Sequence, residues 1–186
     1  MRSKTSVHSL VLASLVTAAA LCQMGCHTAT VTKPLDTSLY ADDADAQMDF
    51  WHTLATRKLA SNNEAFHGFL LYLDGKDAAQ NYQQRVQILK SRHLLPAGFN
   101  EPGDAAVTRG TLSVPIAKTI KIKGGLMRLL LPNDERYATR ELQYEGVYPV
   151  SSPNQLFSGT EFVGVIGKLD DYQHGVAKPV TNRLSE

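Results

Sequence analysis

Three segments of the chain begin with the same helix-capping pattern, and this repetition constrains the fold more than any other feature. A hydroxyl residue opens each segment, at Ser61, Thr108 and Ser158. Such a side chain accepts a hydrogen bond from a free amide of the first helical turn. Glu64 and Glu161 follow two of these residues at the third position, which makes a capping box. The pattern therefore predicts three helices that start in the same way.

Mostly apolar side chains follow each cap at the fourth, eighth and eleventh positions. Residues at this spacing share one face of an α-helix. Pro115 interrupts the second segment and predicts a kink or a shortened helix there. The aligned positions are Ala65, Phe69 and Tyr72, then Leu112, Ile116 and Thr119, then Phe162, Ile166 and Leu169.

A second helix with a similar end precedes two of the capped helices. The segments "YQQRVQILKSRHLLP" and "ERYATRELQYEGVYP" end at Pro96 and Pro149, and aligning these prolines pairs His93 with Gly146. Gly146 suits the left-handed position that ends many helices. The copies lie about 50 residues apart, a period typical of helical arrays. We therefore predict an all-α fold, with three pseudo-repeats of helix–loop–helix in a compact bundle.

The N-terminus is typical of an export signal. Arg2 and Lys4 precede an apolar run over residues 10–21. This run is too short for a membrane span, which needs about 20 apolar residues, but it suits a signal peptide. We predict a signal peptide over residues 1–25, with a transmembrane or buried helix as the alternative.

The end of this signal, "QMGC", resembles the lipobox of bacterial lipoproteins. Gly25 and Cys26 match that motif, whereas Gln23 and Met24 depart from it. The resemblance implies cleavage before Cys26 and a lipid on its thiol, so that the membrane becomes a partner through a lipidated cysteine. An ordinary secretory signal, cut nearby, is the alternative.

The rest of the chain divides by composition. Residues 26–47 are rich in Thr, Ala and Asp without an apolar period, which predicts a flexible tether. Residues 48–172 hold the helical pattern, and within them Trp51, the only tryptophan, is expected in the core. Residues 173–186 are expected to be a disordered tail.

Composition also limits the chemistry of the domain. Both cysteines, Cys22 and Cys26, precede it, so it has no disulfide and no thiolate metal site. Without Arg2 and Lys4 the chain keeps 17 of its 19 basic residues against 18 acidic ones, which does not favour nucleic-acid binding. The histidines lack the spacing of a zinc site, and no catalytic motif occurs. We expect no metal, no cofactor and no enzyme activity.

The starts of the capped helices, "SNNEAF", "VTRGTL" and "FSGTEF", are similar to a motif of another family. With the helix–loop–helix order, residues 49–172 resemble three S-layer homology (SLH) repeats. The resemblance implies a pseudo-threefold helical bundle that binds cell-wall carbohydrate, with a motif arginine on an anionic sugar group. Only Arg109 matches that arginine, because Asn62 and Gly159 stand in the other two places. A solvated side chain is the alternative for Arg109.

These observations lead to one expectation for function. The chain is expected to be an exported, membrane-anchored lipoprotein of the cell envelope, periplasmic or at the surface. Its domain would attach non-catalytically to cell-wall polysaccharide or a surface-layer protein, in grooves lined by Arg109, Tyr148 and Asn154. The alternatives are an envelope enzyme with an unrecognised active site and a structural lipoprotein whose own side chains fill its grooves.

Overall fold

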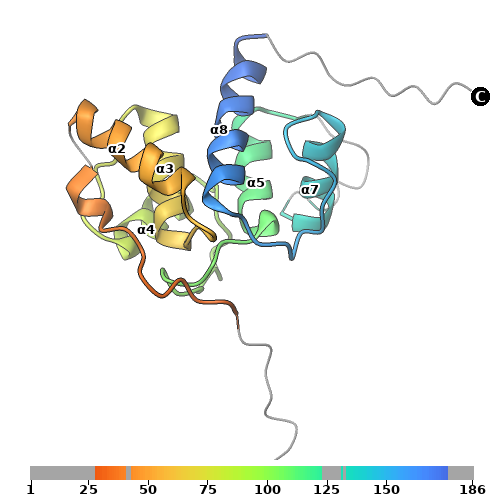
Figure 1. Cartoon of the computed structure of the whole chain (residues 1–186). Coiled ribbons are helices and arrows are strands. Elements are labelled where there is room, and N and C mark those ends of the chain that lie inside the picture. Colours follow the sequence, from red (N-terminus) through yellow and green to blue (C-terminus); the bar gives the residue numbers. More distant parts are fainter. Residues whose placement is uncertain (1–27, 41–42, 123–130, 132, 176–186) are drawn as a thin grey trace, which may run out of the picture.

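The computed structural model describes residues 28–40, 43–122, 131 and 133–175, and their fold is all-helical, as predicted (Figure 1). The predicted signal peptide, Cys26 and residues 176–186 of the predicted tail lie outside the described residues. Within the described residues, a short 3₁₀ helix η2 (Thr37–Tyr40) precedes six α-helices. These are α2 (Ala44–Ala55), α3 (Asn62–Asp74), α4 (Tyr82–Ser91), α5 (Arg109–Thr119), α7 (Glu135–Tyr144) and α8 (Gly159–Gln173).

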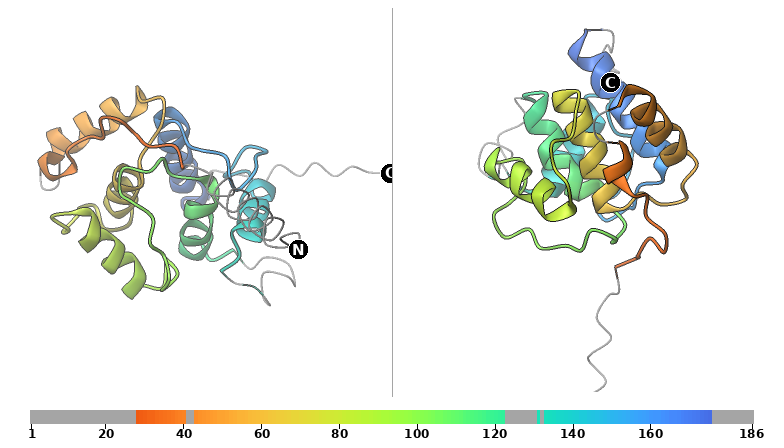
Figure 2. Two further views of the ribbon diagram at one scale, coloured as in Figure 1. Left: turned by 90° about the horizontal axis from the view of Figure 1, so that it is seen from below. Right: turned by 90° about the vertical axis from the view of Figure 1, so that its left-hand side faces the viewer.

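The helices pack in pairs. Helix α5 packs on α7, α2 on α8, and α3 on α4, while α8 also touches α3. Figure 1 shows α8 standing between the α2–α3 side and the α5–α7 side of the domain. The views in Figure 2 place α2 and α4 at one end and α7 at the other. Helix α8 therefore joins the two ends of the domain.

The three predicted caps are confirmed. Ser61 Oγ and Ser158 Oγ each accept a hydrogen bond from the amide three residues on, at 3.2 Å, and both capping boxes are complete. Thr108 Oγ1 accepts from the Thr111 amide at 3.0 Å. Helix α5 contains Pro115 and continues beyond it to Thr119, so the proline does not end the helix.

A closed ring of backbone hydrogen bonds joins the residues that precede the three caps. Ala60 N donates to Phe157 O at 2.9 Å. Phe157 N donates to Val107 O at 3.0 Å, and Val107 N donates to Ala60 O at 2.9 Å. All three residues are fully buried. The starts of α3, α5 and α8 therefore meet at one point inside the domain.

The first amide of each capped helix is held by a segment from elsewhere in the chain. These amides are among the groups that have no partner within the helix itself. Here each one donates to a carbonyl that precedes another cap, at 2.8 to 3.0 Å. The pairs are Asn62 N to Ala105 O, Arg109 N to Gln155 O, and Gly159 N to Arg57 O.

The two helices before the prolines end alike. Gly146 has a φ of 76°, as expected from its sequence, and the aligned His93 has a φ of 56°. A non-glycine residue with a positive φ is uncommon. The backbone amides that follow donate hydrogen bonds to a carbonyl of the last helical turn. Those of Leu94 and Leu95 donate to Leu89 O, and those of Val147 and Tyr148 donate to Leu142 O.

The apolar core fills the space around the ring. Its largest fully buried apolar side chains come from α2, α3, α5 and α8, from the end of α4, and from Phe157. Trp51 is only half-buried and packs against the edge of this core, so its predicted core position holds in part. The large buried side chains are Phe50, Leu54, Phe66, Phe69, Leu70, Leu89, Leu112, Ile116, Phe157 and Phe162.

Part of the segment predicted as a flexible tether belongs to the domain. Val31 N donates to Asp104 O at 2.8 Å, and Leu35 N donates to Glu64 Oε1 at 2.9 Å. Helix α2 begins at Ala44 rather than at residue 48, because Asp43 caps it by accepting from the Ala46 amide. Asp is among the best N-cap residues, so this earlier start has a local cause.

The approach of α8 to α2 gives a stability prediction. A Cβ at Gly159 would overlap the carbonyl oxygen of Leu54, which is backbone and has little room to move. We expect Gly159→Ala to lower the free energy of unfolding by about 3 kcal/mol, measured by urea denaturation. The control is Gly164→Ala in the same helix, where a Cβ meets no atom within 4 Å. This change should stabilise by about 0.5–1 kcal/mol. Equal effects of the two changes would contradict the close approach.

Candidate functional site

Arg109 lies inside the domain and is paired with an acid of the same chain. Its side chain is 1% exposed, and Nη2 donates to Glu161 Oε1 at 2.5 Å. The guanidinium carbon lies 5.1 Å from the centre of the Phe157 ring, within the range of cation–π attraction. Arg109 is therefore not a solvated residue. The anionic partner that its motif position implies is supplied by α8.

Glu161 is held in place from two sides. Its Oε2 accepts hydrogen bonds from Ser158 N at 3.0 Å and Ser158 Oγ at 2.9 Å, while Oε1 faces Arg109. Burial raises the pKa of Glu161, but these hydrogen bonds and the Arg109 charge outweigh it and hold the pKa below its ordinary value. The glutamate of the first capping box is similar, since Glu64 Oε1 lies 3.3 Å from Arg57 Nη2. Each capping box thus ends in an ion pair.

The three residues predicted to line a groove do not form one open site. Tyr148 is buried, and its hydroxyl donates to Arg109 O at 3.3 Å. Burial raises the pKa of Tyr148 well above its ordinary value, so it remains a neutral donor. Asn154 lies exposed in the segment between α7 and α8, where its backbone N–H donates to Ser152 Oγ. The structure therefore brings Arg109 and Tyr148 together and leaves Asn154 outside their cluster.

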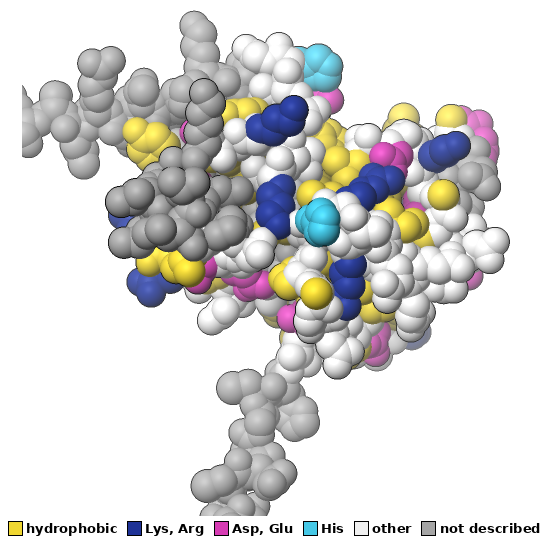
Figure 3. Space-filling model, turned by 180° about the vertical axis from the view of Figure 1, so that it is seen from behind, with side chains coloured by type: hydrophobic (Ala, Val, Ile, Leu, Met, Phe, Trp, Pro, Cys, Tyr) yellow, Lys and Arg dark blue, Asp and Glu magenta, His cyan; other side chains and the backbone are white. Residues whose placement is uncertain are grey.

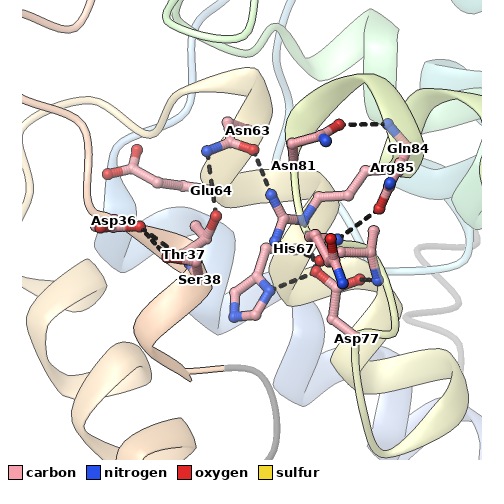
Figure 4. A network of polar contacts seen from close by, with 12 residues as sticks. Asp36, Thr37, Ser38, Asn63, Glu64, His67, Asp77, Asn81, Gln84 and Arg85 are labelled. Atoms are coloured by element: carbon pink, nitrogen blue, oxygen red, sulfur yellow. Dashed lines mark hydrogen bonds and ion pairs between the residues drawn. The ribbon is translucent and has the colours of Figure 1, made fainter.

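A second buried polar network, which sequence reasoning missed, joins α3 to the α3–α4 connection and α4 (Figure 4). Asp77 Oδ2 lies 2.6 Å from His67 Nδ1 and 2.5 Å from Arg85 Nε. Arg85 Nη1 donates to Asn63 Oδ1 at 2.7 Å. Burial raises the pKa of Asp77, but the hydrogen bonds from His67, Ala79 and Arg85 together hold it below its ordinary value. The network keeps an ion pair in the interior of the first half of the domain.

This arrangement fits a structural role better than a chemical one. His67, Asp77 and Arg85 are all almost fully buried, and His67 Nε2 has no hydrogen-bond partner among the described residues. The edge of the Phe50 ring packs against the imidazole, with ring centres 4.6 Å apart. A substrate has no path to these atoms without a change in packing. In the part of the chain that the structure describes, no three His, Cys, Asp or Glu side chains are grouped to hold a metal ion.

The surface of the described residues has hollows that differ in lining. The first, which we call the α4 groove, has a volume of about 480 Å³ and lies between α4 and the loop over residues 99–103. Its lining is rich in aromatic and amide side chains: Tyr82, Gln83, Val86, Gln87, Lys90, Phe99, Asn100, Glu101, Pro102 and Gly103. Helix α4 lies on the face shown in Figure 3, where charged side chains are scattered among neutral ones.

The other two hollows differ from the α4 groove in charge. The basic hollow, about 470 Å³, lies between residues 30–33 and 56–59 and includes Lys33, Arg57 and Lys58. The Trp51 pocket, about 290 Å³, is lined by α2, α3 and α8 and by Gly75. It includes two aromatic rings and one carboxylate, from Trp51, Tyr72 and Asp170.

Comparison of the chain with protein-family models, with curated proteins and with solved structures finds no match in any of the three. Among the described helices, none combines the length and the apolar character that crossing a bilayer requires.

The buried network gives a second stability prediction. Asp77→Ala should lower the free energy of unfolding by about 3–5 kcal/mol, because Arg85 would remain buried without its acid. The matched control is Asp74→Ala, which breaks an exposed pair with Arg92, 2.7 Å long and with side chains 36% and 41% exposed. That loss should be about 1 kcal/mol or less. Urea denaturation of both variants measures the two losses of unfolding free energy. Similar losses would show that the buried pair contributes no more to stability than the exposed pair.

Proposed function

We propose that this chain is an exported, lipid-anchored protein of the bacterial cell envelope. Its helical domain would be a non-catalytic binding module of three SLH-like repeats, which attaches to cell-wall polysaccharide. The observation that carries this proposal is the ring of backbone hydrogen bonds through Ala60, Val107 and Phe157. The ring relates the three capped helices to one centre, which is the geometry that a threefold repeat requires.

Two further observations support a repeated unit. Residues at the same distance before the second and third caps, Ala105 and Gln155, accept from the first amides of the preceding capped helices. Isolated antiparallel bridges pair Ser61 with Ala106 and Thr108 with Leu156, again at matching offsets. Three unrelated helix pairs would have no reason to repeat these contacts.

The α4 groove is the place where we propose that the polysaccharide binds. Sugars present hydroxyl groups on a partly apolar ring, so sites that bind them need both amide groups and aromatic surfaces. Gln83, Gln87 and Asn100 supply the amides, and Phe99 and Tyr82 supply the rings. The Tyr82 hydroxyl donates to Glu101 O at 2.7 Å, which fixes one wall of the groove. In this proposal Arg109 is a structural residue, since it is buried and its Nη2 donates to Glu161.

A structural lipoprotein is the competing function, and one observation favours it. The ion pair between Arg109 and Glu161 fills with the chain's own side chains the position at which SLH-like repeats would hold an anionic sugar. If the α4 groove also bound no ligand in the cell, the domain would be a spacer. Binding measurements on the groove separate the two functions.

The groove gives a binding prediction. The double variant Gln83→Ala/Gln87→Ala should weaken retention on purified cell-wall polysaccharide at least about tenfold, because two hydrogen bonds of about 1 kcal/mol each are lost. The control is Gln84→Ala on the same helix, a residue that does not line the groove and accepts from Gln80 N. Its retention should equal that of the unchanged chain. Retention of the double variant at the control level would rule out the groove, and no retention of any form would favour the structural lipoprotein.

Anchoring gives a separate prediction. Cys26→Ala should remove lipid attachment and the processing that depends on it, so that the labelled chain no longer incorporates radioactive fatty acid and runs as the unprocessed form. Cys22→Ala is the matched control, because it removes the only other thiol of the chain and should leave labelling unchanged. Equal labelling of both variants would refute lipidation at Cys26 and leave the binding module untouched.

A further inference from the structure

We propose that the Trp51 pocket binds a primary alkylammonium group, with the alkyl chain on the aromatic wall and the charge at Asp170. This site is separate from the α4 groove, because the two share no lining residue. It does not depend on lipid anchoring or on polysaccharide binding. The lining of the pocket and its hydrogen bonds carry the inference.

The aromatic wall of the pocket is held rigidly. Trp51 packs edge-on against Phe50, with ring centres 5.1 Å apart, and stacks on Phe162 at 6.3 Å. Gly68 of α3 lies directly beneath, since a Cβ there would come within 2.8 Å of Trp51 Cη2. Tyr72 stacks in turn on Phe69 at 6.5 Å. Trp51 is thus fixed beside the pocket, and its large ring offers apolar surface to an alkyl chain.

The charge of the pocket is negative. Among the described residues that line it, Asp170 is the only ionisable carboxylate or amine, and the others are Gln47, Leu71, Gly75, Ile166 and Gly167, with the two rings. The neighbour of Asp170 is His174, whose Nδ1 lies 2.8 Å from the backbone oxygen of Asp170 and 3.4 Å from its carboxylate. Because the imidazole makes its shorter contact with the backbone, the carboxylate keeps capacity for a second partner.

A polar atom beside the pocket lacks a partner. The Tyr72 hydroxyl is buried and makes no hydrogen bond to any described residue. An unsatisfied buried hydroxyl is costly, so a group that reaches it gains more than it would at the surface. Burial and the nearby Asp170 both raise the pKa of Tyr72, which keeps it a neutral phenol able to accept from an ammonium.

The size and the polarity of the pocket select the ligand. About 290 Å³ accommodates a short alkyl chain rather than an oligosaccharide. Few polar groups line it, and the Gln47 amide already donates to Gly75 O. A sugar would leave most of its hydroxyls without partners. An alkylammonium needs only the apolar wall and one anion, both of which are present. A lysine side chain of a partner or a small diamine would supply the same group.

The chain contains its own reporter for this site. Trp51 is the only tryptophan, so its fluorescence reports occupancy of the pocket directly. The purified full chain would be titrated at pH 8 with n-pentylammonium and, in parallel, with 1-pentanol, which has the same chain without the charge. We expect a saturable change with the amine and binding at least about tenfold weaker with the alcohol, the cost of losing one charge-assisted contact. Equal binding of both compounds, or no saturable change, would overturn the proposal.

Two pairs of variants test the geometry. Asp170→Asn should weaken n-pentylammonium binding about threefold, because the carboxylate is 63% exposed, whereas Asp171→Asn, at the next and exposed residue, should not change it. Gly167→Leu should fill the pocket and abolish binding, whereas Gly164→Leu should have no effect. A Cβ at either glycine meets no atom within 4 Å, so both variants should fold, which thermal denaturation would verify. Unchanged binding by Asp170→Asn or by Gly167→Leu would sink the assignment, as would lost binding by the Asp171 or Gly164 controls.

Discussion

The domain depends on three backbone hydrogen bonds that close a ring at its centre. Ala60, Val107 and Phe157 lie far apart in sequence, and each uses both its amide and its carbonyl in the ring. All three are fully buried, so water cannot replace a lost partner, and an unpaired backbone group there would carry its full desolvation cost. The ring therefore fixes the segments before the three caps relative to one another, and with them the starts of the three capped helices.

Two buried arginines then secure what surrounds the ring. Arg85 and Arg109 are each 1% exposed and have an acid at 2.5 Å, but their acids differ. Asp77 is fully buried, whereas the Glu161 side chain is 41% exposed, so only the first pair is shielded from water on both sides. Removing a buried partner is costly because the remaining charge stays desolvated. Arg109 therefore connects α5 to α8, and an external anion would have to compete with a carboxylate that Ser158 already holds in place.

Local patterns were predictable from the sequence, whereas contacts between distant residues were not. Helix caps and apolar helix faces depend on residues three to eleven apart, and all three caps form as predicted. The same rules missed Asp43 as a cap, because the Thr- and Asp-rich composition before it suggested a spacer. They also missed the His67–Asp77–Arg85 network, since no spacing rule relates a helix interior to a following loop. Arg109 was expected at the surface or on a ligand because no sequence rule predicts its pairing with Glu161, which lies 52 residues away.

If the Trp51 pocket binds a ligand as proposed, its location would link binding to the stability of the whole domain. The pocket is lined by α2, α3 and α8, and α8 is also the helix that carries Glu161 to Arg109. A ligand that binds the folded state alone stabilises it by RT ln(1 + [L]/Kd). Such a ligand would hold α8 against α2 and α3, and so would also hold the ion pair that fixes α5. The α4 groove, in contrast, lies between one helix and a loop, so its occupant has no comparable effect on the packing of α8. Ligands in the two hollows would therefore differ in their effect on the packing of α8 as well as in their chemistry.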